Sequence, residues 1–245
     1  MNCLVDIPIL EVSSLTRTVV IEQQPKNIIK DFSYAFYKKK IYTVIGPSGA
    51  GKSSLLRLLN RLDEPTSGEI IFHNRSYGDY APCELRRKIG YLFQTPYLFK
   101  GTVRDNLLYA NKSLNKDDIE HLTCEVKLKP EQINRPVTNL SVGEMQRVAL
   151  ARLLATSPEI ILLDEPTSAL DPGNQEAIEK LIQEIVVNEK LTAIVVTHHP
   201  DQALRIGQDA ILMVDGKIVE SGIVEQVINH PQSISGKLYK ARQLK

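Results

Sequence analysis

The sequence has few cysteines, almost no net charge and no apolar run near the roughly 18 residues that a membrane-spanning helix needs. Because the formal net charge is only +1, there is no electrostatic case for nucleic-acid binding. Cys3, Cys83 and Cys124 are scattered and fit no metal-binding spacing, so we expect free thiols of a cytosolic protein. Residues 1–6 contain no basic segment, and we expect no signal peptide. If a membrane is involved, a separate protein must supply its span.

A glycine-rich loop lies between a predicted strand over residues 40–45 and a predicted helix over residues 54–62. It fits G-x-x-x-x-G-K-[ST], the pattern of a phosphate-binding loop. Glycines let successive backbone N–H groups surround an anion, and the helix adds the positive end of its dipole. Lys52 would place its charge on the β- and γ-phosphates, and the Ser53 hydroxyl would hold Mg²⁺. The residues expected to bind the nucleotide here are Gly46, Pro47, Ser48, Gly49, Ala50, Gly51, Lys52, Ser53 and Ser54.

Short apolar runs alternate with helical patterns along most of the chain. With 245 residues that are 42% hydrophobic, the chain can form one large α/β domain or a core with an inserted subdomain. Predicted strands cover residues 9–13, 27–36, 69–73, 89–93, 160–164, 193–198, 210–214 and 217–220. Predicted helices cover residues 84–88, 102–109, 116–126, 141–155, a stretch after Asp171-Pro172, and 223–229. This order predicts a mostly parallel sheet with helices on both faces.

The remaining segments are interpreted as connections. Residues 23–27 are turn-like, and the basic residues between Lys237 and Lys245 are expected to be solvated. No buried strand is predicted from residue 95 to about residue 138, which indicates a helical insertion. The helix that follows begins with Ser141-Val142-Gly143-Glu144, which fits the S-x-x-E capping box.

Polar residues follow four of the predicted strands: Gly46, Gln94, Asp164 with Glu165, and His198. In sheets of this kind, ligands bind outside the carboxyl ends of the strands. We therefore expect these residues to meet in one active site.

Each of these residues has an expected role. Asp164 suits a hold on Mg²⁺, and Glu165, which strand alternation turns another way, suits the general base that polarises the attacking water. His198 would hydrogen-bond the γ-phosphate and orient the water and glutamate. Gln94 would contact Mg²⁺ or the attacking water, whereas His199 is expected to be solvated.

The helix start at Ser141 and Gly143 makes a second anion site by the same dipole argument. One γ-phosphate cannot obviously be served by both helix starts of a single chain. Our hypothesis is that two chains pair head to tail, each closing the other's nucleotide, as an isologous twofold pair would allow.

The motifs, taken in order, resemble the nucleotide-binding subunit of ATP-binding cassette (ABC) transporters, and the resemblance covers essentially the whole chain. The matching segments are Gly46–Ser54, Gln94, Leu140–Arg147, Ile160–Glu165, Ser168–Asp171 and His198. The resemblance implies a P-loop NTPase fold with a RecA-like, mostly parallel sheet, an antiparallel β subdomain and an inserted helical subdomain. The core and β subdomain would comprise residues 1–94 and 155–245, and the helical subdomain residues 95–154.

It also implies an ATPase that uses ATP and Mg²⁺. Lys52, Glu165 and His198 would be catalytic, and Ser53, Gln94 and Asp164 would bind Mg²⁺. Residues of the second subunit would close on the ATP: Ser141, Gly143, Glu144 and Asp171. The pair, a homodimer or two ATPase subunits, would associate with an integral membrane permease that docks near residues 95–105. This places the protein at the cytoplasmic face of the cell membrane.

The sequence departs from the family pattern at three places. The usual Leu-Ser-Gly-Gly-Gln carries Val142 and Glu144 instead, which add bulk and a negative charge near phosphate. Either would slow closure unless the capping box compensates. Ser54 replaces the usual threonine, and no adenine-stacking aromatic occurs near residues 17–20.

The Leu-Ser-Val-Gly-Glu variant is similar to ATPases paired with a compact membrane protein in bacterial iron export and plant aluminium tolerance, which is the branch we favour. The alternatives are a phosphate-importer ATPase and a soluble ABC ATPase of the iron–sulfur assembly type. A DNA-repair ATPase would carry long coiled coils, and no sustained heptads occur between residues 94 and 141. A further alternative is a P-loop kinase or a nucleotide-binding regulator without turnover, and Glu165 argues against a pure binder. Cargo and transport direction are not encoded in these motifs.

Overall fold

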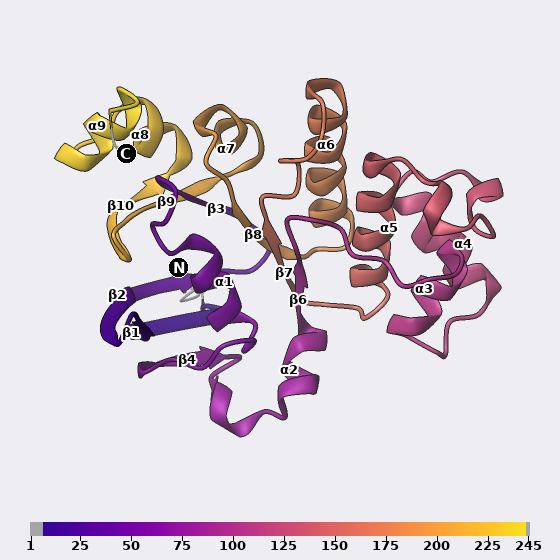
Figure 1. Ribbon diagram of the computed structural model, residues 1–245, viewed down its shortest axis with the longest axis horizontal. Helices are drawn as coiled ribbons and strands as arrows, with labels where there is room; N and C mark the ends of the chain where they lie inside the picture. Colours follow the sequence, from indigo (N-terminus) through magenta and orange to yellow (C-terminus); the bar gives the residue numbers. More distant parts are fainter. Residues whose placement is uncertain (1–6, 244–245) are drawn as a thin grey trace, which may run out of the picture.

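A central sheet runs through the molecule (Figure 1). The computed structural model describes residues 7–243, so residues 1–6 with Cys3, and Lys245, lie outside the described residues. The six described strands lie in the order β10-β9-β3-β8-β7-β6, and neighbouring strands are parallel except β9 with β10. The predicted mostly parallel sheet is confirmed. Its strands are β3 (Ile41–Ile45), β6 (Ile89–Leu92), β7 (Ile160–Asp164), β8 (Thr192–Val196), β9 (Asp209–Val214) and β10 (Lys217–Ile223).

A second, antiparallel sheet has the order β2-β1-β4-β5. Its strands are β1 (Leu10–Ile21), β2 (Gln24–Phe36), β4 (Ser67–Phe72) and β5 (Arg75–Ser76). β1 is longer than the predicted strand over residues 9–13. Register shifts after Val12 interrupt the alternation of side chains on which that prediction depends. The predicted turn over residues 23–27 is wrong: Glu22 and Gln23 form the turn with φ of 51° and 64°, and Pro25 pairs with Val20. A proline is tolerated there because β2 is an edge strand.

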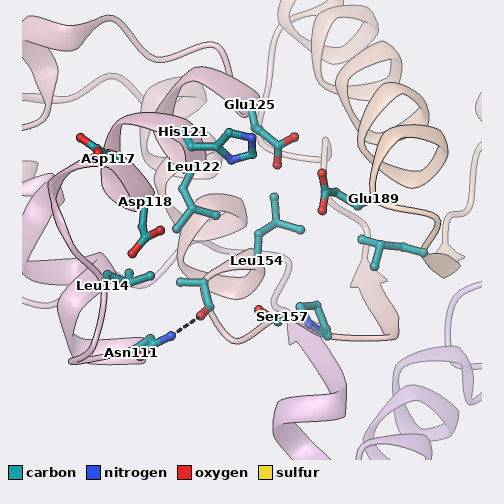
Figure 2. Close-up of a pocket in the computed structure, with 13 residues that line it drawn as sticks. Asn111, Leu114, Asp117, Asp118, His121, Leu122, Glu125, Leu154, Ser157 and Glu189 are labelled. Atoms are coloured by element: carbon teal, nitrogen blue, oxygen red, sulfur yellow. Dashed lines mark hydrogen bonds between the residues drawn. The ribbon is translucent and has the colours of Figure 1, made fainter.

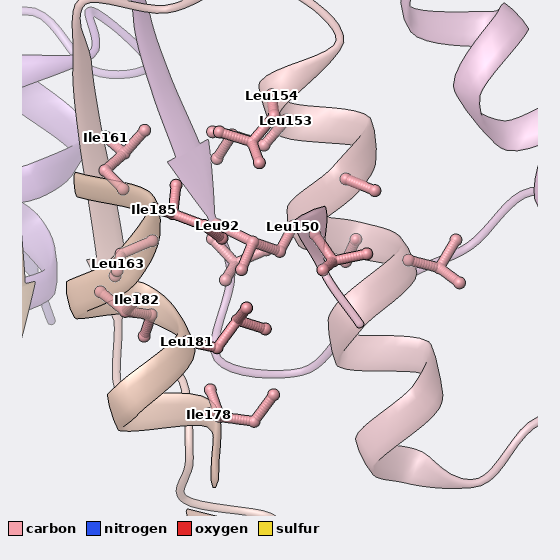
Figure 3. Packing of buried hydrophobic residues seen from close by; sticks show 14 of the residues in the cluster. Leu92, Leu150, Leu153, Leu154, Ile161, Leu163, Ile178, Leu181, Ile182 and Ile185 are labelled. Carbon is pink, nitrogen blue, oxygen red and sulfur yellow. The ribbon is translucent and has the colours of Figure 1, made fainter. Parts of the chain in front are cut away.

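The two faces of the central sheet pack against different layers. Ile161 and Leu163 of β7 pack with helices α5 and α6, whereas Ile160 and Leu162 pack with α1 and the second sheet. Figure 3 shows the apolar stripe of α6 directed toward α5 and β7. Leu181 in this stripe is 0% exposed, and complete burial of such a side chain contributes about 1.5–3 kcal/mol. These helices are α1 (Lys52–Leu59), α5 (Val142–Leu154) and α6 (Pro172–Asn188).

The segment between β6 and β7 contains helices and short turns, and no strand is found among its residues. Each helix begins with a reciprocal capping box, formed by Thr102 with Asp105, Asn115 with Asp118, and Ser141 with Glu144. The predicted helical insertion and its S-x-x-E box are therefore confirmed, while the boundaries at 94/95 and 154/155 stay a prediction. In Figure 1 these helices form one end of the molecule. They are α3 (Val103–Ala110), α4 (Lys116–Glu125) and α5.

The other end carries two helices that the sequence patterns did not fully predict. The expected helix over residues 223–229 is α8 (Val224–Asn229), but the tail expected to be solvated forms a further helix, α9 (Ile234–Lys240). Lys237 and Lys240 are exposed as expected, whereas Tyr239 is partly buried. Two more short helices are α2 (Pro82–Lys88) and α7 (Pro200–Ile206), of which α7 was not predicted.

Within residues 7–243, no helix has both the length and the apolar character required to cross a bilayer. Cys83 and Cys124 are exposed free thiols, as expected.

Candidate active site

The loop between β3 and α1 is held by close backbone contacts that require glycine. A Cβ on Gly46, whose φ is +146°, would lie 2.0 Å from the carbonyl oxygen of Met213. A Cβ on Gly51, at φ +97°, would lie 2.6 Å from the carbonyl oxygen of Ile28. Since no side chain fits at either position, the loop packs closely against β9 at Gly46 and against β2 at Gly51.

Lys52, the first residue of α1, is nearly buried, at 6% exposed. Its ammonium group donates to the carbonyl oxygens of Gly46 and Pro47, both at 2.8 Å. Burial lowers the pKa of Lys52, and the charges of Glu165 and Asp164 act in the opposite direction. The loop therefore encloses a cation next to the helix N-terminus, where an anion is favoured.

Asp164 ends β7 and turns toward α1. Its Oδ1 accepts a hydrogen bond from the Ser53 hydroxyl at 2.9 Å, and its Oδ2 accepts one from the Tyr91 hydroxyl at 2.8 Å. Burial and the charge of Asp164 raise the pKa of Tyr91, which keeps the phenol protonated as a donor. Tyr91 was not predicted as a site residue, although it lies within the predicted strand over residues 89–93 that precedes Gln94.

Glu165 turns away from Asp164, as expected. It has a φ of 45° in the left-handed region, which is uncommon for a residue other than glycine and occurs at functional sites. Its Oε1 lies 3.0 Å from Nδ1 of His198, and its Oε2 accepts from the Gln94 amide at 3.2 Å. Side chains following β6, β7 and β8 thus meet at one point.

These groups share a cavity of about 710 Å³. Lys26 and Ile28 of β2 also line it and were not predicted as site residues. Among residues 7–243, no aromatic side chain lines this cavity. The lining residues are Lys26, Ile28, Ser48, Gly49, Gly51, Lys52, Ser53, Ser54, Gln94, Glu165 and His198.

Eight predicted site residues do not line this cavity. Gly46, Pro47, Ala50 and Asp164 adjoin residues that line it, whereas Ser141, Gly143, Glu144 and Asp171 belong to the starts of α5 and α6. Ser141 caps α5, and its N–H donates to the Glu144 carboxylate at 2.7 Å. Asp171 caps α6, and a Cβ on Gly143 would lie 3.6 Å from Oδ1 of Asn174, so the starts of α5 and α6 are neighbours. The single chain assembles one part of the predicted site and leaves this second part elsewhere.

The Glu144 carboxylate is paired with neighbouring donors in the same chain. The pKa of Glu144 is lowered, and the largest cause is the hydrogen bond from the Ser141 backbone. Its Oε1 also accepts from the Gln132 amide at 2.5 Å, and Arg135 lies 3.9 Å away. The capping box therefore offsets the negative charge that the sequence places here.

The donors present fit Mg²⁺ and a nucleotide phosphate. The Ser53 hydroxyl and the Asp164 carboxylate supply adjacent oxygen atoms, the ligand type that Mg²⁺ prefers. The glycine-rich loop and Lys52 supply N–H donors and a positive charge for phosphate. Together with the parallel sheet, these features define a P-loop nucleotide hydrolase.

The model of the ABC transporter family matches residues 29–168, and the chain belongs to this family as its ATP-binding ATPase domain. Protein STAR1 of Oryza sativa is 41% identical over 217 residues, which are 87% of this chain but only 62% of STAR1. The phosphate import ATP-binding protein PstB 3 of Natronomonas pharaonis is 35% identical over 89% of this chain and 84% of its own length.

Solved structures give the same assignment. The ATP-binding cassette MJ0796, in a dimer bound to ADP and Pi, has a TM-score of 0.77 at 29% identity over 88% of this chain and 98% of that one. CbiO1 from Clostridium perfringens, part of the ABC transporter complex cbiONQ, has a TM-score of 0.82 at 27% identity over 91% of this chain and 92% of its own. The expected P-loop NTPase fold with its two additional subdomains is confirmed.

Proposed function

We propose that two copies of this chain enclose ATP and Mg²⁺ between them and hydrolyse the ATP to drive a separate membrane permease. The observation that carries the proposal is the placement of Glu165 between Gln94 and His198, in the same cavity as Lys52 and Ser53. A carboxylate fixed by two neighbours beside a phosphate-binding loop suits a general base for water.

The chain's own groups divide the work. Residues 46–54 and Lys52 bind the phosphates, and Ser53, Asp164 and Gln94 hold Mg²⁺, which when bound offsets phosphate charge. Glu165 accepts a proton from the attacking water. His198, in contact with Glu165 Oε1, keeps that carboxylate oriented.

The second copy completes the site. Ser141 and Gly143 present the N-terminus of α5, which is a 13-residue helix outside the cavity of its own chain. Asp171 and Glu144 lie at the same surface, with the Glu144 charge offset by its capping partners. Val142 is 42% exposed, so its extra bulk faces the partner rather than the core.

Mixing two inactive variants tests this arrangement. Ser141→Arg blocks the closing helix and Lys52→Ala disables the P-loop, so each pure variant should be inactive. A mixed pair retains one intact site, formed from the P-loop of the first and the α5 start of the second. Phosphate release in an equal mixture should therefore recover to about a quarter of the wild-type rate, because about half of the pairs are mixed and each has one intact site of two. No recovery at any mixing ratio, with dimers still forming, would contradict a shared site.

An aromatic groove beside Gln94 is the proposed permease contact. Tyr97 is 70% exposed and Tyr109 64% exposed, and the Phe99 ring lies 3.8 Å from the Tyr109 ring between centroids. Arg86 and Arg152 line the same groove of about 310 Å³. We assign this groove to a short amphipathic helix of the permease. An apolar side chain of that helix would pack on the aromatic rings, and a carboxylate would pair with Arg86 or Arg152. Gln94 directly precedes the groove, and its side-chain amide donates to Glu165. A permease helix that docks in the groove would therefore lie next to a residue that contacts Glu165.

We place the assembly at the cytoplasmic face of the cell membrane, in the iron-export and aluminium-tolerance branch that the Leu-Ser-Val-Gly-Glu sequence favours. The identity to PstB 3 supports a phosphate importer as the alternative. A soluble iron–sulfur assembly ATPase shares every motif and differs in its partner. Co-expression with the adjacent membrane gene, followed by ATPase stimulation with iron or phosphate, separates the three: a soluble ATPase would co-purify with no membrane protein.

A further inference from the structure

The C-terminal helix reaches the candidate active site through one side chain. Figure 1 shows α9 beside α8, at the end of the molecule opposite the inserted helices. The Tyr239 hydroxyl donates to the carbonyl oxygen of His198 across 3.3 Å. Gly46 opens the P-loop and His198 follows β8. One side chain of α9 therefore contacts the segment after β8 and the apolar cluster that contains Ile45, the residue before Gly46.

The phenol is fixed from several sides. Its ring packs against the apolar cluster that contains Ile45 and Leu212, beneath the start of the P-loop. Glu220 of β10 anchors the segment before α9, since Oε2 accepts from the Ser233 hydroxyl at 2.6 Å and Oε1 accepts from the Gln232 N–H at 2.8 Å. A side chain held this way can impose its position on its hydrogen-bond partners.

The Tyr239 hydroxyl stays protonated under ordinary conditions. Burial raises the pKa of Tyr239 to about 12, with the Gly46 backbone acting in the opposite direction. The group is therefore a hydrogen-bond donor to His198 at neutral pH.

We propose that Tyr239 is a positioning residue for ATP hydrolysis: it holds the His198 backbone against the start of the P-loop and so directs the imidazole at Glu165. The proposal rests on the function assigned above. The His198 side chain is 46% exposed and lies 3.0 Å from Glu165 Oε1, so the direction of its ring depends on where the backbone is held. The C-terminal helix thereby becomes part of the catalytic framework.

Tyr239→Phe tests the hydroxyl while the ring keeps its packing. Because one modest hydrogen bond is lost, kcat should fall about three- to tenfold, with the KM for ATP within about twofold of wild type. Tyr34→Phe is the control, since it removes a hydroxyl from β2 within an aromatic cluster around Tyr42 and should change neither value. An unchanged kcat in Tyr239→Phe would overturn the proposal.

A double-mutant cycle separates positioning from general loosening of the fold. If Tyr239 acts through His198, the loss caused by Tyr239→Phe should disappear in a His198→Ala background. An equal fold-loss in both backgrounds would show that Tyr239 acts by another route and would overturn the proposal.

A measurement without nucleotide keeps this test independent of ATPase activity. The imidazole NMR signals of His198, assigned by their loss in His198→Ala, should shift in Tyr239→Phe and stay in place in Tyr34→Phe. Unshifted signals would refute the positioning role even if the protein hydrolyses ATP. Shifted signals in a protein without turnover would instead count against the proposed function.

Discussion

The molecule contains two polar clefts of similar size that differ in how their carboxylates are partnered. The cleft at the P-loop measures about 710 Å³, and the cleft between the inserted helices and the core measures about 630 Å³. Figure 2 shows the second cleft, where Glu125 of α4 and Glu189 after α6 point toward one another. Its other polar lining residues are Asn111, Asp117, Asp118, His121 and Ser157.

At the P-loop cleft, both Glu165 in its lining and the neighbouring Asp164 contact side chains that can donate. Asp164 accepts from Ser53 and Tyr91, while Glu165 accepts from Gln94 and contacts His198. These contacts fix where each oxygen points, as a group that handles water or a metal ion requires.

In the second cleft, two acids meet each other. Burial raises the pKa of Glu125, the hydrogen bond and charge of Glu189 raise it further, and His121 acts in the opposite direction. The raised pKa of Glu125 makes this cleft sensitive to pH. The comparison teaches that the volume of a cleft does not identify a catalytic site, whereas the donors around its acids do.

The largest expected effect contrasts a glutamate from each cleft. Glu165→Gln removes the proposed base, so phosphate release should fall at least about 100-fold while ATP binding is retained and the dimer becomes trapped. Glu125→Gln, the matched control, should keep turnover within about twofold. Wild-type turnover in Glu165→Gln, or a comparable loss in Glu125→Gln, would contradict the assignment of the general base to the P-loop cleft.

A smaller effect is expected at the donor to Asp164. Tyr91→Phe leaves Asp164 Oδ2 without that hydrogen bond, so the carboxylate is less well oriented toward Ser53. We expect the Mg²⁺ concentration for half-maximal ATPase activity to rise by about tenfold, the effect of roughly 1.4 kcal/mol. A magnesium titration measures this, with Tyr37→Phe as the control. A shift below twofold would mean that the Ser53 contact alone orients Asp164.

The smallest effect concerns the stability of the second cleft. Because the folded-state pKa of Glu125 is raised, its stabilising contribution is complete below the ordinary value of 4.5 and is lost as pH rises through the raised value. Glu125→Gln should therefore stabilise the protein at pH 8 by a few tenths of a kcal/mol, with a smaller gain at pH 5.

Thermal melting at the two pH values measures the difference. Glu131→Gln, at an exposed carboxylate of the same helical insertion, serves as the control. An equal shift for both variants at both pH values would argue against a raised pKa of Glu125.

The parts of the fold that could be predicted from sequence depend on local signals. The run Ile160–Leu163 is apolar and, together with Asp164, forms a fully buried strand. The Ser141 and Asp171 caps depend on residues three positions away. Gln94, Asp164, Glu165 and His198 were found because parallel strands end at one edge of the sheet.

The parts that were missed depend on contacts between distant segments. Tyr91 reaches Asp164 across 73 positions and Tyr239 reaches His198 across 41, and no local pattern indicates either contact. Pro25 suggested a turn, yet it occupies an edge strand whose pairing only the assembled sheet reveals.

The separation of the α5 start from the P-loop cleft has a consequence for how the enzyme responds to its abundance. In the proposed arrangement an isolated chain is idle, so at low concentration the specific rate should grow with the amount of protein present. Dilution then acts as a brake on ATP consumption. Two copies held together by a permease would hydrolyse ATP even at low protein concentration, so hydrolysis would be fastest where transport takes place.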